Sequence, residues 1–107
     1  TKLPPLVILL HGGGGAKDVA AIDQAFLDMG MATLSFDAFK MNGFEKTPFI
    51  NNWSRQKMIW SISVGAYKWA IKQTHYPVSD VYIYGISNGA TVVVNLAGLI
   101  KPGRIVC

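Results

Sequence analysis

The chain alternates between short apolar runs and longer stretches in which apolar residues recur with a helical period. The apolar runs are bounded by glycine, proline or polar clusters, and they span residues 6–10, 31–36, 81–84 and 104–107. Helical spacing is found in residues 18–29, 53–74 and 90–97. Runs of this length are typical of strands, so the order of elements is β-α-β-α-β-α-β. This order predicts an α/β fold, in which helices cover both faces of a parallel sheet.

The two longer helical segments each carry an apolar face that can cover such a sheet. The face of the first comprises Val19, Ile22, Ala25, Phe26 and Met29, and the face of the second comprises Trp60, Val64, Tyr67 and Ile71. Gly30 is expected to end the first helix. Residues 37–52 lack a period and contain Gly43 and Pro48, so they are predicted to form a long loop.

The segment Gly85-Ile86-Ser87-Asn88-Gly89 has the form Gly-x-Ser-x-Gly and joins a predicted strand to a predicted helix. In this setting the pattern is typical of a nucleophile elbow, where the serine stands on a turn so sharp that its backbone is strained. A Cβ at Gly85 or Gly89 is expected to collide with neighbouring backbone, so glycine fits both positions. The alternative is an ordinary glycine-rich turn.

A second glycine-rich segment, His11 followed by Gly12 to Gly15, comes directly after the first predicted strand. Such a loop can approach a substrate closely and offer backbone N–H groups to the oxyanion that forms when a carbonyl is attacked. Glycine-rich loops also bind phosphates. However, this one lacks a Gly-Lys-Ser/Thr ending, and Lys17 stands where a dinucleotide fingerprint requires glycine.

A serine nucleophile needs a histidine as its base and an acid that orients the histidine. Enzymes with an elbow place both after the serine, but residues 90–107 contain no His, Asp or Glu. His11 is predicted to shape the glycine loop, and His75 is predicted to lie at the opposite edge of the sheet, about 15 Å or more from Ser87. The sequence therefore predicts a nucleophile whose base and acid lie outside these residues.

Asp37 follows the second predicted strand, at the edge of the sheet where α/β folds place ligand sites. Its carboxylate can line such a site, but an Asp in this position more often caps the turn that opens the next segment. Phe39, Phe44, Phe49 and Trp53 follow it, and they can line a substrate pocket or pack the loop down. The sequence alone does not separate these alternatives.

Composition narrows the possible partners. The net charge is +4, but the ten basic residues are scattered and do not alternate with aromatic residues as in a nucleic-acid groove. Half of the residues are hydrophobic, which excludes disorder, yet the apolar runs are too short to span a membrane. Cys107 is the single cysteine, so an internal disulfide is excluded and a reducing compartment is compatible.

With these motifs the chain resembles the α/β-hydrolase family, and within it the dienelactone hydrolase-like and esterase branch. The resemblance rests on His11-Gly12-Gly13-Gly14-Gly15 after a strand, Asp37 past the next strand, and Gly85-Ile86-Ser87-Asn88-Gly89-Ala90. It implies that the chain corresponds to the third to sixth of the family's eight strands. In the family those strands lie in the spatial order four, three, five, six.

The same resemblance implies roles for individual residues. Ser87 would be the nucleophile, and the N–H groups of Asn88 and of Gly13 or Gly14 would form the oxyanion hole. His11, Gly12, Gly85 and Gly89 would shape the two loops. The catalytic acid and histidine would both lie beyond Cys107.

Three functions remain open at this stage. The first is a serine hydrolase that acts on small-molecule esters through an acyl-enzyme. The second is a hydrolase-like module that binds small molecules without catalysis, and the third is a flavodoxin-like nucleotide-binding domain. No cofactor, metal, nucleic acid or membrane is expected as a partner. Because the pattern stops within a predicted strand, residues 1–107 are expected to form one incomplete domain.

Overall fold

The computed structural model describes residues 4–73, 80–96 and 104–106. The strands are β1 (Leu6–Leu10), β2 (Ala32–Ser35), β3 (Val81–Gly85) and β4 (Arg104–Val106). The helices are α1 (Ala20–Asp28), α2 (Ala38–Met41), α3 (Asn52–Gln73) and α4 (Asn88–Leu96), and a short 3-10 helix, η1, spans Gly15–Asp18. Among the described helices, none is both long and apolar enough to cross a membrane.

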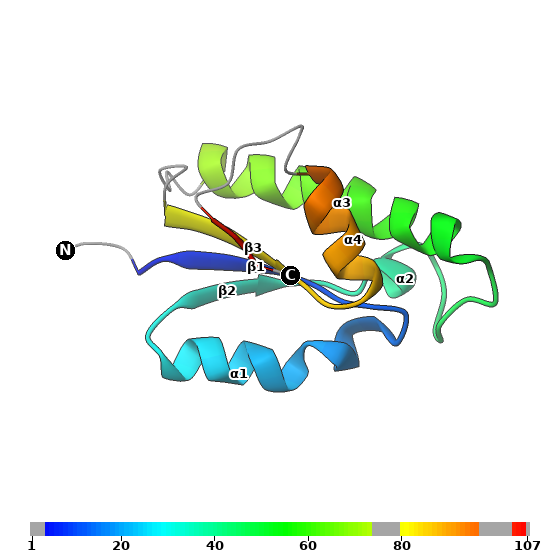
Figure 1. The fold of residues 1–107 in the computed structure, drawn as a ribbon, viewed down its shortest axis with the longest axis horizontal. Coiled ribbons are helices and arrows are strands. Elements are labelled where there is room, and N and C mark those ends of the chain that lie inside the picture. Colours follow the sequence, from blue (N-terminus) through cyan, green and yellow to red (C-terminus); the bar gives the residue numbers. More distant parts are fainter. Residues whose placement is uncertain (1–3, 74–79, 97–103, 107) are drawn as a thin grey trace.

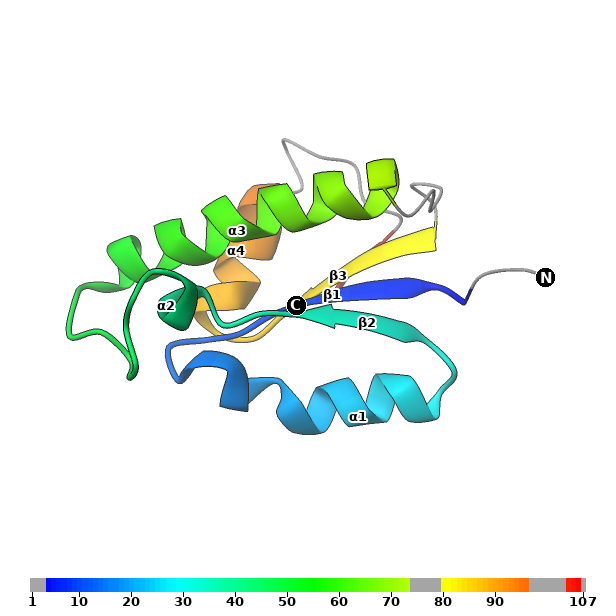
Figure 2. The same cartoon turned by 180° about the vertical axis from the view of Figure 1, so that it is seen from behind.

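The four strands form one parallel sheet in the order β2-β1-β3-β4. This confirms the predicted α/β fold and the strand order that the family resemblance implies. β1 is a central strand, because Leu6 pairs with Ala32 of β2 on one side and with Val81 of β3 on the other. Helix α1 covers one face of the sheet, while α3 and α4 cover the opposite face (Figures 1 and 2).

The alternation of side chains along β1 divides the core between these two layers. Leu6, Ile8 and Leu10 belong to the cluster that packs under α3 and α4, while Val7 and Leu9 belong to the cluster on the α1 side. All five side chains are buried, which explains why β1 is a continuous apolar run rather than an alternating one.

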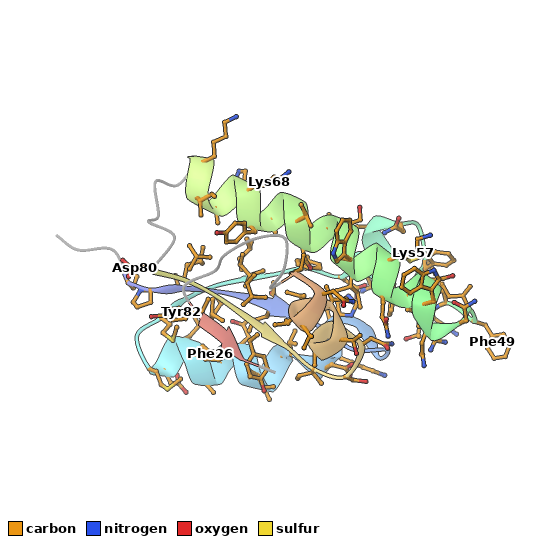
Figure 3. All side chains as sticks on the ribbon, turned by 45° about the horizontal axis from the view of Figure 1, so that its top comes forward. Phe26, Phe49, Lys57, Lys68, Asp80 and Tyr82 are labelled. Carbon is orange, nitrogen blue, oxygen red and sulfur yellow. The ribbon has the colours of Figure 1, made fainter. Side chains whose placement is uncertain are left out.

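Strand β3 divides in the same way, with larger side chains on the α1 side. Val81 and Ile83 are buried under α3 and α4, whereas Tyr82 and Tyr84 are half-buried against the α1 layer. The rings of Phe26 and Tyr84 meet edge to face with centroids 5.6 Å apart. Figure 3 labels Phe26 and Tyr82, which both lie in this layer.

Helix α1 buries a narrower face than its sequence predicts. Val19 is buried and Ile22 and Phe26 are half-buried, but Ala25 is exposed and Met29 is 65% exposed. The helix ends as predicted at Gly30, whose φ is +85°. Gly30 N–H donates to Leu27 O and Met31 N–H donates to Phe26 O, which is the hydrogen-bond pattern of a Schellman motif.

Helix α3 is rotated slightly from the orientation that its large residues indicate. Its buried positions are Ile59, Ser63, Tyr67 and Ala70. Val64 and Ile71 are half-buried beside them as predicted, but Trp60 is 37% exposed. The Ser63 hydroxyl donates to Ile59 O at 2.6 Å, so this buried polar group is satisfied within its own helix.

The predicted loop over residues 37–52 is wrong in its first part, where the short helix α2 follows Asp37 directly. The strands and longer helices otherwise agree with the predictions to within one or two residues at most of their described ends. The predictions for His75, Ala97 and Cys107 fall outside the described residues.

Candidate active site

The predicted motifs meet at the carboxyl ends of β1 and β3, which are neighbours in the sheet. The chain leaves β1 toward α1 on one face and leaves β3 toward α4 on the other (Figure 1). The two connections therefore leave the sheet on opposite faces. In open α/β sheets, such a switch point is where ligands bind.

Ser87 occupies the turn between β3 and α4 with the geometry of an elbow. Its φ is +55°, and among the described residues it is the only non-glycine with a positive φ. Its side chain is exposed at the surface. Gly89 N–H closes the turn by donating to Ile86 O at 2.8 Å, and Ile86 N–H donates to Leu10 O at 3.2 Å. A strained, exposed serine at a strand–helix turn fits a nucleophile.

The flanking glycines are required because backbones converge here. A Cβ at Gly85 would contact the backbone of Gly89 and lie 2.7 Å from the Ala90 nitrogen. A Cβ at Gly89 would contact the backbone of Leu10 and lie 2.7 Å from His11 O. Both collisions confirm the prediction made from the motif.

The glycine loop after β1 lies directly against this turn. A Cβ at Gly12 would lie 3.0 Å from Ser87 Cβ and 3.0 Å from Ile86 O. The next residue, Gly13, faces Asn88, since a Cβ at Gly13 would lie 3.5 Å from Asn88 Nδ2. The structure thus brings together Ser87, Asn88 and the glycine run, which are 70 or more positions apart in sequence.

Two of the three predicted oxyanion donors are free to act in the described part of the chain. Neither Asn88 N–H nor Gly13 N–H has an acceptor there, and Asn88 begins α4, where the helix dipole favours negative charge. Gly14 N–H instead donates to Asp18 Oδ2 at 3.0 Å. Of the two glycines considered, Gly13 is therefore the one that can serve an oxyanion.

His11 is fully buried and uses both ring nitrogens to join loops. Ala38 N–H donates to Nε2 at 2.9 Å, so Nε2 must be an acceptor. The ring proton then lies on Nδ1, which donates to Gly12 O at 2.8 Å. With both nitrogens engaged inside the fold, His11 cannot take a proton from Ser87, and its geometry fits the predicted loop-shaping role.

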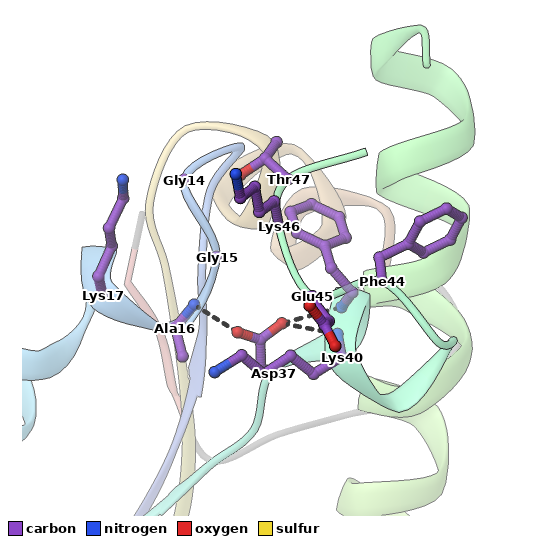
Figure 4. A pocket seen from close by; sticks show the side chains of 11 residues that line it. Gly14, Gly15, Ala16, Lys17, Asp37, Lys40, Phe44, Glu45, Lys46 and Thr47 are labelled. Carbon is purple, nitrogen blue, oxygen red and sulfur yellow. Dashed lines mark hydrogen bonds between the residues drawn. The ribbon is translucent and has the colours of Figure 1, made fainter. Parts of the chain in front are cut away.

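Asp37 is the N-cap of α2, which is the capping role that its position favours. Its Oδ1 accepts from Phe39 N–H and Lys40 N–H, both at 3.0 Å, and its Oδ2 accepts from Ala16 N–H at 3.3 Å (Figure 4). Burial raises the pKa of this carboxyl, but its backbone N–H donors and the nearby His11 lower it by more. The pKa of Asp37 therefore lies below its usual value.

The aromatic residues after Asp37 lie in different parts of the structure. Phe39 and Phe44 line a cavity of about 480 Å³ beside the glycine loop, into which Gly14 and Gly15 also face (Figure 4). Trp53 lines a different groove between α3 and α4. Phe49 is fully exposed and projects from the end of the molecule (Figure 3).

Three residues at this site were not found by sequence reasoning. Asp18 binds the glycine loop through Gly14 N–H, and its only sequence signal was an Asp four positions after a glycine turn. Arg55 and Gln56, near the start of α3, lie close to Gly13 and Asn88 respectively. Those contacts are long-range, so no local spacing predicts them. In the described ranges, no three His, Cys, Asp or Glu side chains gather to hold a metal ion.

Comparison with known proteins supports the fold of the chain but does not indicate an activity. No protein-family model matches the chain, and no curated protein sequence matches it. Similar folds occur among solved structures, including the crystal structure of TT1662 from Thermus thermophilus, at 20% identity and a TM-score of 0.76. The match covers 96% of this chain and 46% of TT1662, so the chain spans about half the length of that protein.

Proposed function

We propose that the chain is the nucleophile-bearing part of a serine hydrolase of the α/β-hydrolase family that cleaves carboxylic esters. The observation that carries this proposal is the conformation of Ser87, an exposed serine held at a φ of +55° on a strand–helix turn. Backbone strain persists only where the surrounding structure imposes it, and here the glycine loop, whose Gly13 N–H has no acceptor among the described residues, lies against Ser87.

In the proposed reaction, Ser87 Oγ attacks the ester carbonyl carbon while a base takes the hydroxyl proton. Negative charge develops on the former carbonyl oxygen, where Asn88 N–H and Gly13 N–H can stabilise it. The carbon–oxygen bond to the alcohol then breaks, and the alcohol leaves with the proton. Water hydrolyses the acyl-enzyme and restores Ser87. His11 is not this base, because both of its ring nitrogens are engaged inside the fold.

A hydrolase-like module that binds small molecules without catalysis is the second candidate. It is favoured by one observation, namely that His11 is engaged on both sides and cannot act as the base. Nucleotide binding has less support. The carboxylate of Asp18 accepts from the glycine loop at Gly14 N–H, and a negative charge in that place opposes a phosphate group.

Hydrolysis of an activated aryl ester by the full-length protein tests the proposal. We expect turnover by the wild type and a loss of at least about 10³-fold in kcat for Ser87→Ala, because loss of a nucleophile leaves only residual catalysis. Ser61→Ala, on the exposed side of α3, is the matched control and should retain full activity. Binding of the ester without turnover in the wild type would favour the binding module instead.

A further inference from the structure

Asn88 has a side-chain amide beside the glycine loop in addition to its backbone N–H. The residue is only 8% exposed, so its amide side chain lies almost entirely inside the fold. Its Oδ1 accepts a hydrogen bond from Gln56 Nε2 at 3.1 Å. The other end of the amide, Nδ2, points to the glycine loop and lies 3.5 Å from the position of a Cβ on Gly13.

The Nδ2 donors have no acceptor among the described residues. Every fully buried side-chain nitrogen and oxygen in the described part of the chain does have a hydrogen-bond partner. The Nδ2 group is therefore not fully buried and reaches the surface on the side of Gly13. A largely buried amide with one end bound and the other end open is oriented toward whatever enters that space.

Gln56 holds the oxygen end of the Asn88 amide. It lies near the start of α3 and is half-buried, and its Nε2 donates to Asn88 Oδ1. This bond leaves Nδ2 on the side of Gly13. A residue at position 56 that could only accept would bind Nδ2 and turn Oδ1 toward Gly13 instead.

The charge around this space also favours an oxyanion. Arg55 Nη1 lies 3.9 Å from the same Cβ position on Gly13. The guanidinium is held in place because Nε and Nη2 both donate to Pro48 O, at 3.2 and 2.9 Å. A fixed positive charge and the open Nδ2 group thus lie together on the Cβ side of Gly13.

We propose that the Asn88 side chain, oriented by Gln56, donates a further hydrogen bond to the oxyanion of the reaction, beside the backbone donors Asn88 N–H and Gly13 N–H. Asn88 is then a catalytic residue through its side chain, and Gln56 is a positioning residue. The inference rests on the proposed function, because an oxyanion forms only if Ser87 attacks a carbonyl.

The test measures kcat and KM of the full-length protein on an activated ester and on its thionoester, whose sulfur accepts hydrogen bonds poorly. Asn88→Ala keeps the backbone N–H and removes only the amide. We expect kcat on the ester to fall by about 10²-fold, as for loss of one oxyanion donor, with KM within about threefold. The preference for ester over thionoester should fall with it. Asn95→Ala, an exposed asparagine on the same helix, should leave both constants unchanged.

Gln56→Glu provides the sharper variant. The carboxylate would accept from Asn88 Nδ2, so the hydrogen bond survives while Oδ1 turns toward Gly13. We expect this variant to keep its denaturation midpoint yet lose more kcat than Gln56→Leu, which frees the amide to rotate. A purely structural role predicts the reverse order, because Gln56→Leu breaks the bond and Gln56→Glu keeps it.

The outcomes separate this inference from the proposed function. If Ser87→Ala retains the wild-type rate, the proposed function fails. If the rate depends on Ser87 but Asn88→Ala and Gln56→Glu both stay within threefold of the wild-type kcat, the side-chain donor is overturned while the hydrolase survives. Because Gln56→Glu preserves the packing, its kcat still tests the side-chain donor if Asn88→Ala misfolds.

Discussion

The backbone strain at Ser87 depends on two glycines that allow β3 and α4 to converge above β1. Gly89 is the more constrained by the neighbouring strand, since a Cβ there would contact the backbone of Leu10 and lie 2.7 Å from His11 O. Backbone atoms of a central strand cannot move aside as a flexible side chain can. The packing of helix against strand therefore requires glycine at both positions.

Gly89→Ala is expected to lower the free energy of unfolding by about 3 kcal/mol, because the strand and helix must separate to admit one methyl group. Gly65→Ala is the matched control, since Gly65 is an exposed glycine of α3 with no neighbour within 4 Å of its Cβ position. That change should stabilise the protein by about 0.5–1 kcal/mol. Urea denaturation of both variants measures the difference. Equal small effects would mean that residues 85–89 form an ordinary turn.

We expect the free energy of unfolding to depend on pH through the carboxylate of Asp37. Its pKa is lowered in the folded state, so its contribution is present above the unfolded pKa of about 3.9 and is lost as the pH falls through the folded pKa. Asp37→Asn should lower the urea midpoint at pH 7, and its deficit should shrink toward pH 3. Asp28→Asn, on the far helix α1, is the control. A deficit that stayed constant between the two pH values would show that the charge of Asp37 contributes nothing.

The elements show where sequence patterns suffice and where they do not. The strands are set by apolar runs whose neighbours bury them on both sides, so β1 and the position of Ser87 at the end of β3 could be predicted from residue types alone. Helix α2 could not, because four residues carry no period and the helix is started by the capping carboxylate of Asp37. The buried side of α3 was also misjudged, because Trp60 is large and apolar yet faces solvent.

Because His11 joins two loops, replacing it should have a different effect from replacing a catalytic base. His11→Phe should leave Ala38 N–H buried without its acceptor, at a cost of about 1–3 kcal/mol in the free energy of unfolding. Activity should fall through disorder of the glycine loop but should not vanish. Activity and denaturation midpoints measured together test this. Full stability with complete loss of turnover would contradict the positioning role.

At the scale of the whole molecule, the sheet brings distant motifs together. The order β2-β1-β3-β4 places the glycine loop and the elbow side by side, and this order followed from the family resemblance rather than from any local pattern. The contacts of Arg55 and Gln56 could not be predicted, because they depend on how α3 sits over the sheet. The chain spans about half the length of TT1662.

The most direct measurement is covalent labelling of the full-length protein with an organophosphonate, followed by peptide mapping. Only a base-activated hydroxyl beside oxyanion donors attacks such a probe quickly. We expect a single adduct, on Ser87, and no labelling of the Ser87→Ala variant. An adduct on another serine, such as Ser54 or Ser61 of α3, or labelling that persists in Ser87→Ala, would contradict the assignment of Ser87 as the nucleophile.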